Sequence, residues 1–172
     1  MNKLPHVSDV LRPWINTEWV KDEHLLRGQK RHGAFAAYLL GGWSPRVDPQ
    51  DEGQYRSFCS WADRHVLKVI AVEITLADRD HGFVGTLDAI LQTSFCPCLV
   101  PDWKPGSTSK TWRPQIAAYR HLAIKNGYPV ERAGFLQPSK DGGTAKLTYV
   151  EDSIIDFSVF LSALNTYRYF NS

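Results

Sequence analysis

The spacing of hydrophobic positions divides the chain into a helical first part and a mixed second part. In residues 21–40, apolar side chains return every three or four positions, which predicts a long helix with one buried face. A second helix is expected at residues 52–66, and a brief one within residues 4–14, where Ser8 or Asp9 would cap it.

From residue 67 onward, runs of β-branched and apolar residues bounded by turn residues predict a sheet. Three strands, a helix, two shorter strands and a final helix are expected, at residues 67–76, 83–91, 98–104, 108–126, 132–138, 145–150 and 152–169 in that order. Thr108 or Ser109 would cap the first of these helices. The pattern predicts one α/β domain over residues 1–172: N-terminal helices in residues 1–66, then a central twisted mixed β-sheet flanked by helices in residues 67–172.

Composition and charge narrow the classes of protein that this chain can be. With 43% hydrophobic residues among 172, it can bury a real core, which excludes a disordered chain. A net charge of +2 is only mildly basic, so contacts with nucleic acid would have to come from local clusters of Lys and Arg. No apolar run approaches the roughly 20 residues of a membrane span. We therefore expect a protein of the cytoplasm with no membrane partner.

The cysteines give a weaker signal. Three cysteines are too few for a disulfide framework, and their odd number fits a reducing cytosol. Cys96 and Cys98 flank a proline, and they are either small buried residues near a turn or one corner of a metal site.

Three carboxylates are expected to meet across the first three strands. If the turn between the second and third strands is centred on Phe95, Asp88 lies directly opposite Asp102. If the turn between the first and second strands is centred near residues 80–81, Glu73 lies opposite Asp88. Three carboxylates in one row repel one another unless a cation lies between them. Glu73 has a second interpretation, as an edge carboxylate paired with Arg or Lys.

Lys104 shares a strand face with Asp102, because the two are separated by a single residue. Mg²⁺ prefers carboxylate oxygens and retains waters, one of which can be a nucleophile. A lysine beside the metal can orient that water or neutralise charge on a phosphate. The main-chain carbonyl of Trp103 could complete the coordination shell. The pattern therefore favours a phosphodiester-cleaving site built by Asp88, Asp102 and Lys104.

Four short motifs occur in the order and spacing of a known nuclease family. Residues 85–88 read G-T-L-D, residues 102–104 read D-W-K, and residues 115–119 read Q-I-A-A-Y. An early helix carries His32. Together the motifs resemble the PD-(D/E)XK nuclease superfamily, in its RecB-like or phage-type exonuclease branch, over residues 4–119.

The resemblance implies a restriction-endonuclease-like core and metal-dependent hydrolysis of DNA. It implies these catalytic residues: Asp88, Asp102, Lys104, Gln115 and Tyr119. The implied metal ligands are His32, Asp88, Asp102 and the carbonyl of Trp103, with Glu73 as a further candidate and His24 as a weaker one. An imidazole ligand favours Mn²⁺ over Mg²⁺.

The resemblance also suggests cofactors and partners. The cofactor would be Mg²⁺ or Mn²⁺. The partner would be DNA, cleaved from its ends during phage recombination or DNA processing in a bacterial host cell, alongside a recombination or single-strand-annealing protein. No iron–sulfur cluster is expected, because no cysteine follows Cys98. No nucleotide cofactor is expected, because the sequence has no G-x-x-x-x-G-K-[ST] motif.

Basic residues near these motifs are candidate contacts to DNA phosphates: Lys30, Arg31, Lys110, Arg113 and Arg120. Such contacts position a nucleic acid without reading its sequence. The alternative is that these residues form solvated helix faces. Trp103 and Trp112 also have two interpretations, since they could stack on an unpaired base or pack in the core.

Three other functions are compatible with the sequence. The first is a structure-specific or nicking endonuclease of the same superfamily. The second is a catalytically silent DNA-binding or inhibitor protein, against which the complete set of Asp88, Asp102 and Lys104 argues. The third is a Mg²⁺-dependent enzyme acting on a nucleotide or another phosphate ester, which no glycine-rich phosphate loop supports.

Overall fold

The computed structural model describes residues 4–15, 22–41, 46–104, 108–151 and 153–171, with the side chains of residues 22–25 outside the description. Its elements follow in chain order: α1 (Val7–Leu11), a 3₁₀ turn (Arg12–Trp14), α2 (Asp22–Leu39), α3 (Glu52–His65), β1 (Val66–Asp78), β2 (Phe83–Thr93), β3 (Cys96–Trp103), α4 (Trp112–Lys125), β4 (Arg132–Gln137), β5 (Lys146–Tyr149) and α5 (Ser153–Asn171). Every helix and strand expected from the sequence is present.

The five strands form one mixed sheet in the order β1-β2-β3-β4-β5. Three of the four neighbouring pairs are antiparallel, and β3 and β4 are parallel. Parallel neighbours need a long crossover, and α4 supplies it here. The predicted fold class is confirmed as an α/β domain with a mixed sheet flanked by helices, while the restriction-endonuclease-like core stays a prediction.

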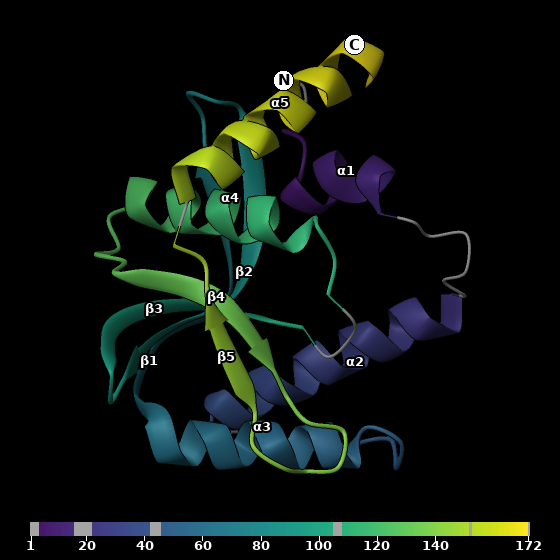
Figure 1. Ribbon diagram of the computed structural model, residues 1–172, viewed down its shortest axis with the longest axis vertical. Helices are drawn as coiled ribbons and strands as arrows, with labels where there is room; N and C mark the ends of the chain where they lie inside the picture. The colour runs from purple at the N-terminus through teal and green to yellow at the C-terminus, as the bar shows by residue number, and fades with distance from the viewer. Residues whose placement is uncertain (1–3, 16–21, 42–45, 105–107, 152, 172) are drawn as a thin grey trace.

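Helices cover both faces of the sheet (Figure 1). On one face, α1, α4 and α5 pack around a core that includes the fully buried Leu122 and Phe160. On the other, α2 and α3 pack around a core that includes Phe35, Phe58 and Trp103. The central strands β2 and β3 are consequently buried on both sides, as strands between two helical layers are. None of the described helices is both long and apolar enough to cross a bilayer.

Both turns have the register expected from the sequence. Strands β1 and β2 pair around a centre between residues 80 and 81, from the pair Ile74 and Leu87 to the pair Asp78 and Phe83. Leu91 pairs with Leu99 across β2 and β3, the register of a turn centred on Phe95, although the pair nearest the turn is shifted.

Two predicted helix starts are wrong. The N-cap of α1 is His6, whose ring accepts the N–H of Ser8, so neither Ser8 nor Asp9 is the cap. Helix α4 begins at Trp112 instead of just after Thr108 or Ser109. The hydroxyl of Ser109 accepts the N–H of Thr111, which forms a local turn before the helix. Lys21, Asp152 and the side chain of His24 lie outside the described residues.

Candidate active site

The candidate active site lies where the end of β3 and the middle of β2 meet helices from both layers. Helix α2 is anchored by Phe35, whose ring stacks on Phe58 with centroids 4.2 Å apart. One turn earlier on α2, His32 reaches β2, and its Nδ1 lies 3.0 Å from Asp88 Oδ1. The other carboxylate oxygen of Asp88 accepts the main-chain N–H of Trp103 at 2.7 Å. Asp88 therefore joins α2, β2 and β3.

Glu73 completes a group of three ligand side chains. One ligand atom each from His32, Glu73 and Asp88 lies within 4.8 Å of the others. Glu73 has a φ of 49°, in the left-handed region, although it lies in the middle of β1. Such a conformation costs about 1–3 kcal/mol for a non-glycine residue and is typical of functional sites. The structure therefore favours the metal-ligand interpretation of Glu73 over an edge ion pair.

A polar chain runs from the third carboxylate into α4. Asp102 Oδ2 lies 2.7 Å from the ammonium of Lys104, which donates to Gln115 Oε1 at 2.7 Å. The amide nitrogen of Gln115 donates in turn to the hydroxyl of Tyr119 at 3.1 Å. Four of the residues predicted to be catalytic are thus connected. Asp88 also accepts the Trp103 main-chain N–H, and its position opposite Asp102 stays a prediction from the register.

Gly85 lets α4 come close enough for this chain to form. A Cβ atom at Gly85 would lie 2.8 Å from a Leu122 methyl carbon and 2.9 Å from the Tyr119 ring. A larger residue would force the Leu122 and Tyr119 side chains to shift. The glycine of the G-T-L-D motif is therefore a packing requirement of this site.

The pKa values of two carboxyl groups of the site, Asp102 and Glu73, are raised. Burial raises the pKa of Asp102 to about 6, the Asp88 charge adds to the effect, and the Lys104 charge opposes it. Burial also raises the pKa of Glu73, again with a contribution from Asp88. Asp102 Oδ2 is buried, and its close neighbour is the Lys104 ammonium at 2.7 Å.

The pKa values of His32 and Asp88 shift in the opposite sense to those of isolated buried groups. Burial alone would raise the pKa of Asp88, but the His32 charge, its hydrogen bond and the Trp103 N–H outweigh burial and lower it. Burial alone would lower the pKa of His32, but Asp88 and Asp102 outweigh it and raise it. The pair is therefore held as a carboxylate facing an imidazole that protonates readily.

These donors fit a hard or borderline divalent cation. Mg²⁺ and Mn²⁺ take carboxylate oxygens, and imidazole suits Mn²⁺ better than Mg²⁺. His32, Glu73 and Asp88 supply the ligand atoms that converge, whereas Asp102 is paired with Lys104 and its metal-ligand role stays a prediction. For Trp103 the structure shows a main-chain N–H contact to Asp88, and the metal-ligand role of its carbonyl stays a prediction.

The two tryptophans of the site are core residues, so the idea that they stack on bases is wrong. Trp103 is fully buried against Phe58, with ring centroids 5.0 Å apart, and Trp112 is only 8% exposed. Cys96 and Cys98 are likewise buried free thiols near the β2–β3 turn. Their packing interpretation is the one that the structure supports.

Two of the candidate DNA contacts on α4 hold α5 in place. Arg113 forms a two-pronged ion pair with Asp156, through Nε at 3.0 Å and Nη2 at 3.0 Å from Oδ2. Arg120 donates to the hydroxyl of Ser153 at 3.2 Å. Both guanidinium groups therefore make structural contacts in this conformation.

On α2, Arg31 is also committed to internal partners, whereas its neighbour is exposed. Arg31 Nη1 lies 3.2 Å from Asp51 Oδ1 and donates to Gln54 Oε1 at 2.8 Å. Lys30, next to it, is exposed, as is Lys110 ahead of α4. Lys30 and Lys110 are thus the better placed of the five predicted phosphate contacts.

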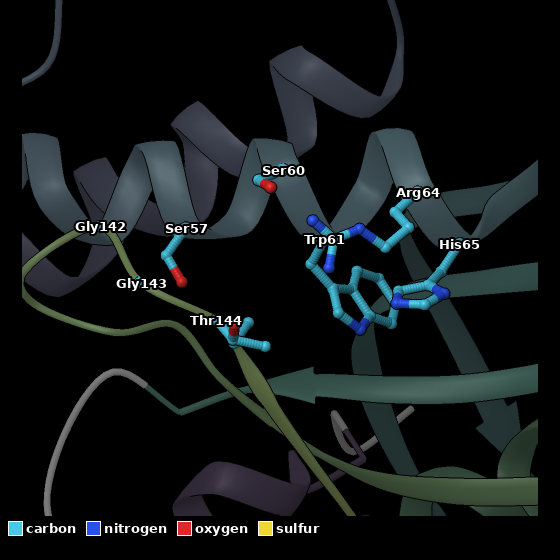
Figure 2. A pocket seen from close by; sticks show the side chains of 9 residues that line it. Ser57, Ser60, Trp61, Arg64, His65, Gly142, Gly143 and Thr144 are labelled. Carbon is cyan, nitrogen blue, oxygen red and sulfur yellow. The ribbon is translucent and has the colours of Figure 1, made fainter.

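Cavities border α2 and α3. One, of about 490 Å³, runs beside α2 and is lined by basic residues, among them Lys30 and Arg46, and by two aspartates, Asp48 and Asp51. Another, of about 230 Å³, lies between α3 and the loop before β5, where Arg64 and Thr144 line it (Figure 2). None of the predicted catalytic residues lines this second cavity.

No family model matches the chain, and no curated protein sequence matches it. Function is therefore inferred from the geometry of the site.

Proposed function

We propose that this chain is a divalent-metal-dependent DNA nuclease with a PD-(D/E)XK-type site. The observation that carries the proposal is the convergence of His32, Glu73 and Asp88 beside the Asp102–Lys104 pair. Three carboxylates crowd there, and the pKa values of two of them, Glu73 and Asp102, are raised by burial and by the Asp88 charge. A divalent cation would relieve this crowding.

The chain's own residues would divide the work as follows. His32, Glu73 and Asp88 would hold the cation, and Asp102 would add a ligand oxygen. Once bound, the cation would act as a Lewis acid on a phosphate oxygen and lower the pKa of a coordinated water. The Trp103 N–H fixes one oxygen of Asp88, so the other oxygen keeps its direction toward His32 and the cation.

Lys104 would supply a positive charge that stabilises the negatively charged transition state. Its ammonium lies between the Asp102 carboxylate and the Gln115 amide oxygen, each 2.7 Å away. Tyr119 holds the Gln115 amide, because its hydroxyl accepts the amide N–H. The ammonium is thus fixed where it can orient the attacking water or stabilise charge on the pentacoordinate phosphate.

The DNA would lie along the basic side of α2 and approach the start of α4. Lys30 is exposed and lines the cavity beside α2, and Lys110 is exposed ahead of α4. These contacts would neutralise phosphates without reading bases. With few exposed cations flanking the site, we infer cleavage from DNA ends, as expected for an exonuclease of phage recombination or DNA processing.

The test compares linear and closed circular DNA. Wild-type protein should release labelled nucleotides from end-labelled linear duplex in Mn²⁺ or Mg²⁺, be silent in EDTA, and leave covalently closed circles intact. Asp88→Asn should be inactive in the same preparation, and Lys140→Gln, an exposed loop change, should be fully active.

Two outcomes would change the proposal. Relaxation of closed circles by wild type but not by Asp88→Asn would replace the exonuclease with an endonuclease. Equal cleavage by wild type and Asp88→Asn, or no cleavage with either metal, would overturn the nuclease proposal.

A further inference from the structure

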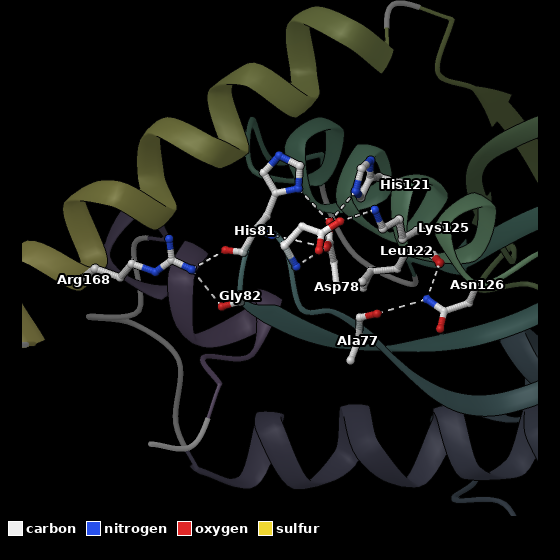
Figure 3. Close-up of polar contacts among 10 residues, drawn as sticks. Ala77, Asp78, His81, Gly82, His121, Leu122, Lys125, Asn126 and Arg168 are labelled. Atoms are coloured by element: carbon white, nitrogen blue, oxygen red, sulfur yellow. Dashed lines mark hydrogen bonds and ion pairs between the residues drawn. The ribbon is translucent and has the colours of Figure 1, made fainter. Parts of the chain in front are cut away.

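A second carboxylate–histidine cluster lies at the C-terminal end of β1, beyond Glu73. Asp78 ends that strand, His81 lies in the β1–β2 turn, and His121 comes from α4 (Figure 3). Asp78 Oδ2 accepts from His81 Nδ1 at 2.7 Å and from His121 Nε2 at 2.6 Å. These three residues are called the turn cluster below. Two imidazoles thus point at one oxygen of a fully buried carboxylate.

The surroundings of the turn cluster fix all three side chains. The other oxygen of Asp78 accepts the main-chain N–H groups of Asp80, at 2.9 Å, and His81, at 3.2 Å. Phe157 of α5 stacks on His121 with centroids 4.1 Å apart and planes 16° apart, and it meets the His81 ring edge-on at 5.8 Å. Hydrogen bonds to a ligating carboxylate and an apolar wall around the ligands are what metal sites use to orient their ligands.

We propose that the turn cluster binds one borderline transition-metal cation of the Zn²⁺ type. The ligands are Asp78 Oδ2, His81 Nδ1 and His121 Nε2, which lie within 4.8 Å of one another. A water supplies the fourth position of a tetrahedral site. Each ring then carries its proton on the nitrogen that faces away from the metal.

The distances require only a small opening of the cluster. Tetrahedral zinc with bonds of about 2.0–2.1 Å separates its ligand atoms by about 3.3 Å. The present separations from Asp78 Oδ2 are 2.7 Å for His81 and 2.6 Å for His121. Rotations about the imidazole side-chain bonds can supply the difference without moving the backbone that holds Asp78.

Access and geometry also favour a metal. The His81 and His121 side chains are 42% and 27% exposed, whereas that of Asp78 is fully buried. A cation can therefore reach the cluster from the imidazole side and keep a water there. Because Arg168 of α5 also donates to the carbonyls of His81 and Gly82, a metal here would fix a turn that already joins β1, β2, α4 and α5 (Figure 3).

The experiment separates this site from the candidate active site by working in His32→Ala protein. In that background, calorimetry should show one Zn²⁺ per chain, and Co²⁺ should give the intense visible absorption of four-coordinate cobalt. Adding His121→Ala should weaken Zn²⁺ binding by about tenfold or more, because even the loss of a residue that only orients a ligand has an effect of this size. It should also abolish the Co²⁺ band. Adding His65→Ala, the matched control on α3, should change neither.

A folding defect is distinguished from ligand loss in two ways. His81→Ala, in an exposed part of the turn, should reproduce the loss of zinc affinity, and circular dichroism should show that each variant is folded without metal. Excess Zn²⁺ should raise the melting temperature of His32→Ala protein but not of the two double variants. Folded His32→Ala protein that binds no Zn²⁺, or zinc affinity unchanged by both His121→Ala and His81→Ala, would overturn the proposal, whatever the nuclease assay shows.

Discussion

The two carboxylate–histidine clusters on β1 differ in how well their charges are satisfied. At the turn cluster, the single carboxylate of Asp78 accepts four hydrogen bonds. Burial alone would raise its pKa, but the His81, His121 and backbone N–H donors outweigh burial and lower the pKa. At the candidate active site, three carboxylates share one imidazole and one ammonium, and two of them have raised pKa values.

The two clusters differ in their effect on the stability of the fold. A satisfied buried carboxylate contributes to stability, and removing it leaves donors without an acceptor. Crowded carboxylates and a strained backbone, by contrast, destabilise the chain unless a ligand relieves them. We therefore expect substitutions in the turn cluster to lower stability and substitutions in the candidate active site to lower activity.

The largest effect is expected at Lys104. Lys104→Gln should reduce the rate of cleavage by about 10²–10³-fold, the scale for removing one fixed charge from a transition state. Steady-state release of nucleotides from end-labelled DNA measures it. Stability should fall only modestly, because the neighbouring Asp102 already has a raised pKa and can become neutral. Activity within a few-fold of wild type would mean that another cation serves the reaction.

A large loss of stability is expected at the turn cluster. In EDTA, Asp78→Asn should lower the free energy of unfolding by about 2–3 kcal/mol, because its amide cannot accept from every donor that now faces the carboxylate. Urea denaturation measures the change. Asp80→Asn, an exposed carboxylate in the same turn, is the matched control and should have little effect.

The pH dependence of this loss has a defined sign. The pKa of Asp78 lies below its usual value, so its stabilisation is present above the ordinary carboxyl pKa and disappears as the pH falls through the lowered one. The difference between wild type and Asp78→Asn should therefore narrow only in strong acid. A difference that vanished already at neutral pH would contradict the hydrogen-bonding account.

Metal binding at the candidate active site should strengthen as the pH rises. Protons compete with the cation for His32 and Asp102, whose pKa values are both raised, that of Asp102 to about 6. Affinity for Mn²⁺ should increase by about tenfold or more between pH 5 and 7.5, since one pH unit is a factor of ten for each competing proton. Calorimetry measures it, and Asp102→Asn should flatten the profile. A flat wild-type profile would remove Asp102 from the site.

The smallest effect is a gain of stability at Glu73. Glu73→Gly should raise the free energy of unfolding by about 0.5–1 kcal/mol in EDTA, because glycine adopts positive φ without strain and removes one crowded carboxylate. Lys68→Gly, at an exposed position of the same strand, should lower it by a similar amount. A loss at both positions would show that the backbone at Glu73 is not strained in solution.

The sheet was predictable from the sequence because each hairpin is local. Turn residues on either side of Phe83–Thr93 set both registers, and these brought Glu73 and Asp88 to matching positions. The parallel pairing of β3 and β4 through α4 was not predicted, because it joins strands that are distant in the sequence. Local patterns could not predict the φ of Glu73, which depends on how the strand meets its neighbours.

Long-range partners also escaped prediction. His121 lies 43 residues after Asp78, and only the packing of α4 brings them together. The contact between Asp78 and His81 could have been predicted, since the two are three residues apart in a turn. In the same way, nothing in the sequence showed that Arg113 meets Asp156, so a paired guanidinium was predicted to be a DNA contact.

The parallel pairing of β3 and β4 affects what a fragment of this protein could do. Trp103 pairs with Leu136, and the N–H of Lys104 donates to the Leu136 carbonyl at 2.9 Å. A polypeptide that stopped after α4 would contain every candidate catalytic residue, yet β3 would be an unpaired edge carrying Asp102 and Lys104. Such an edge invites aggregation between chains. During synthesis, therefore, the end of β3 acquires its strand partner only after the last of these residues has been made.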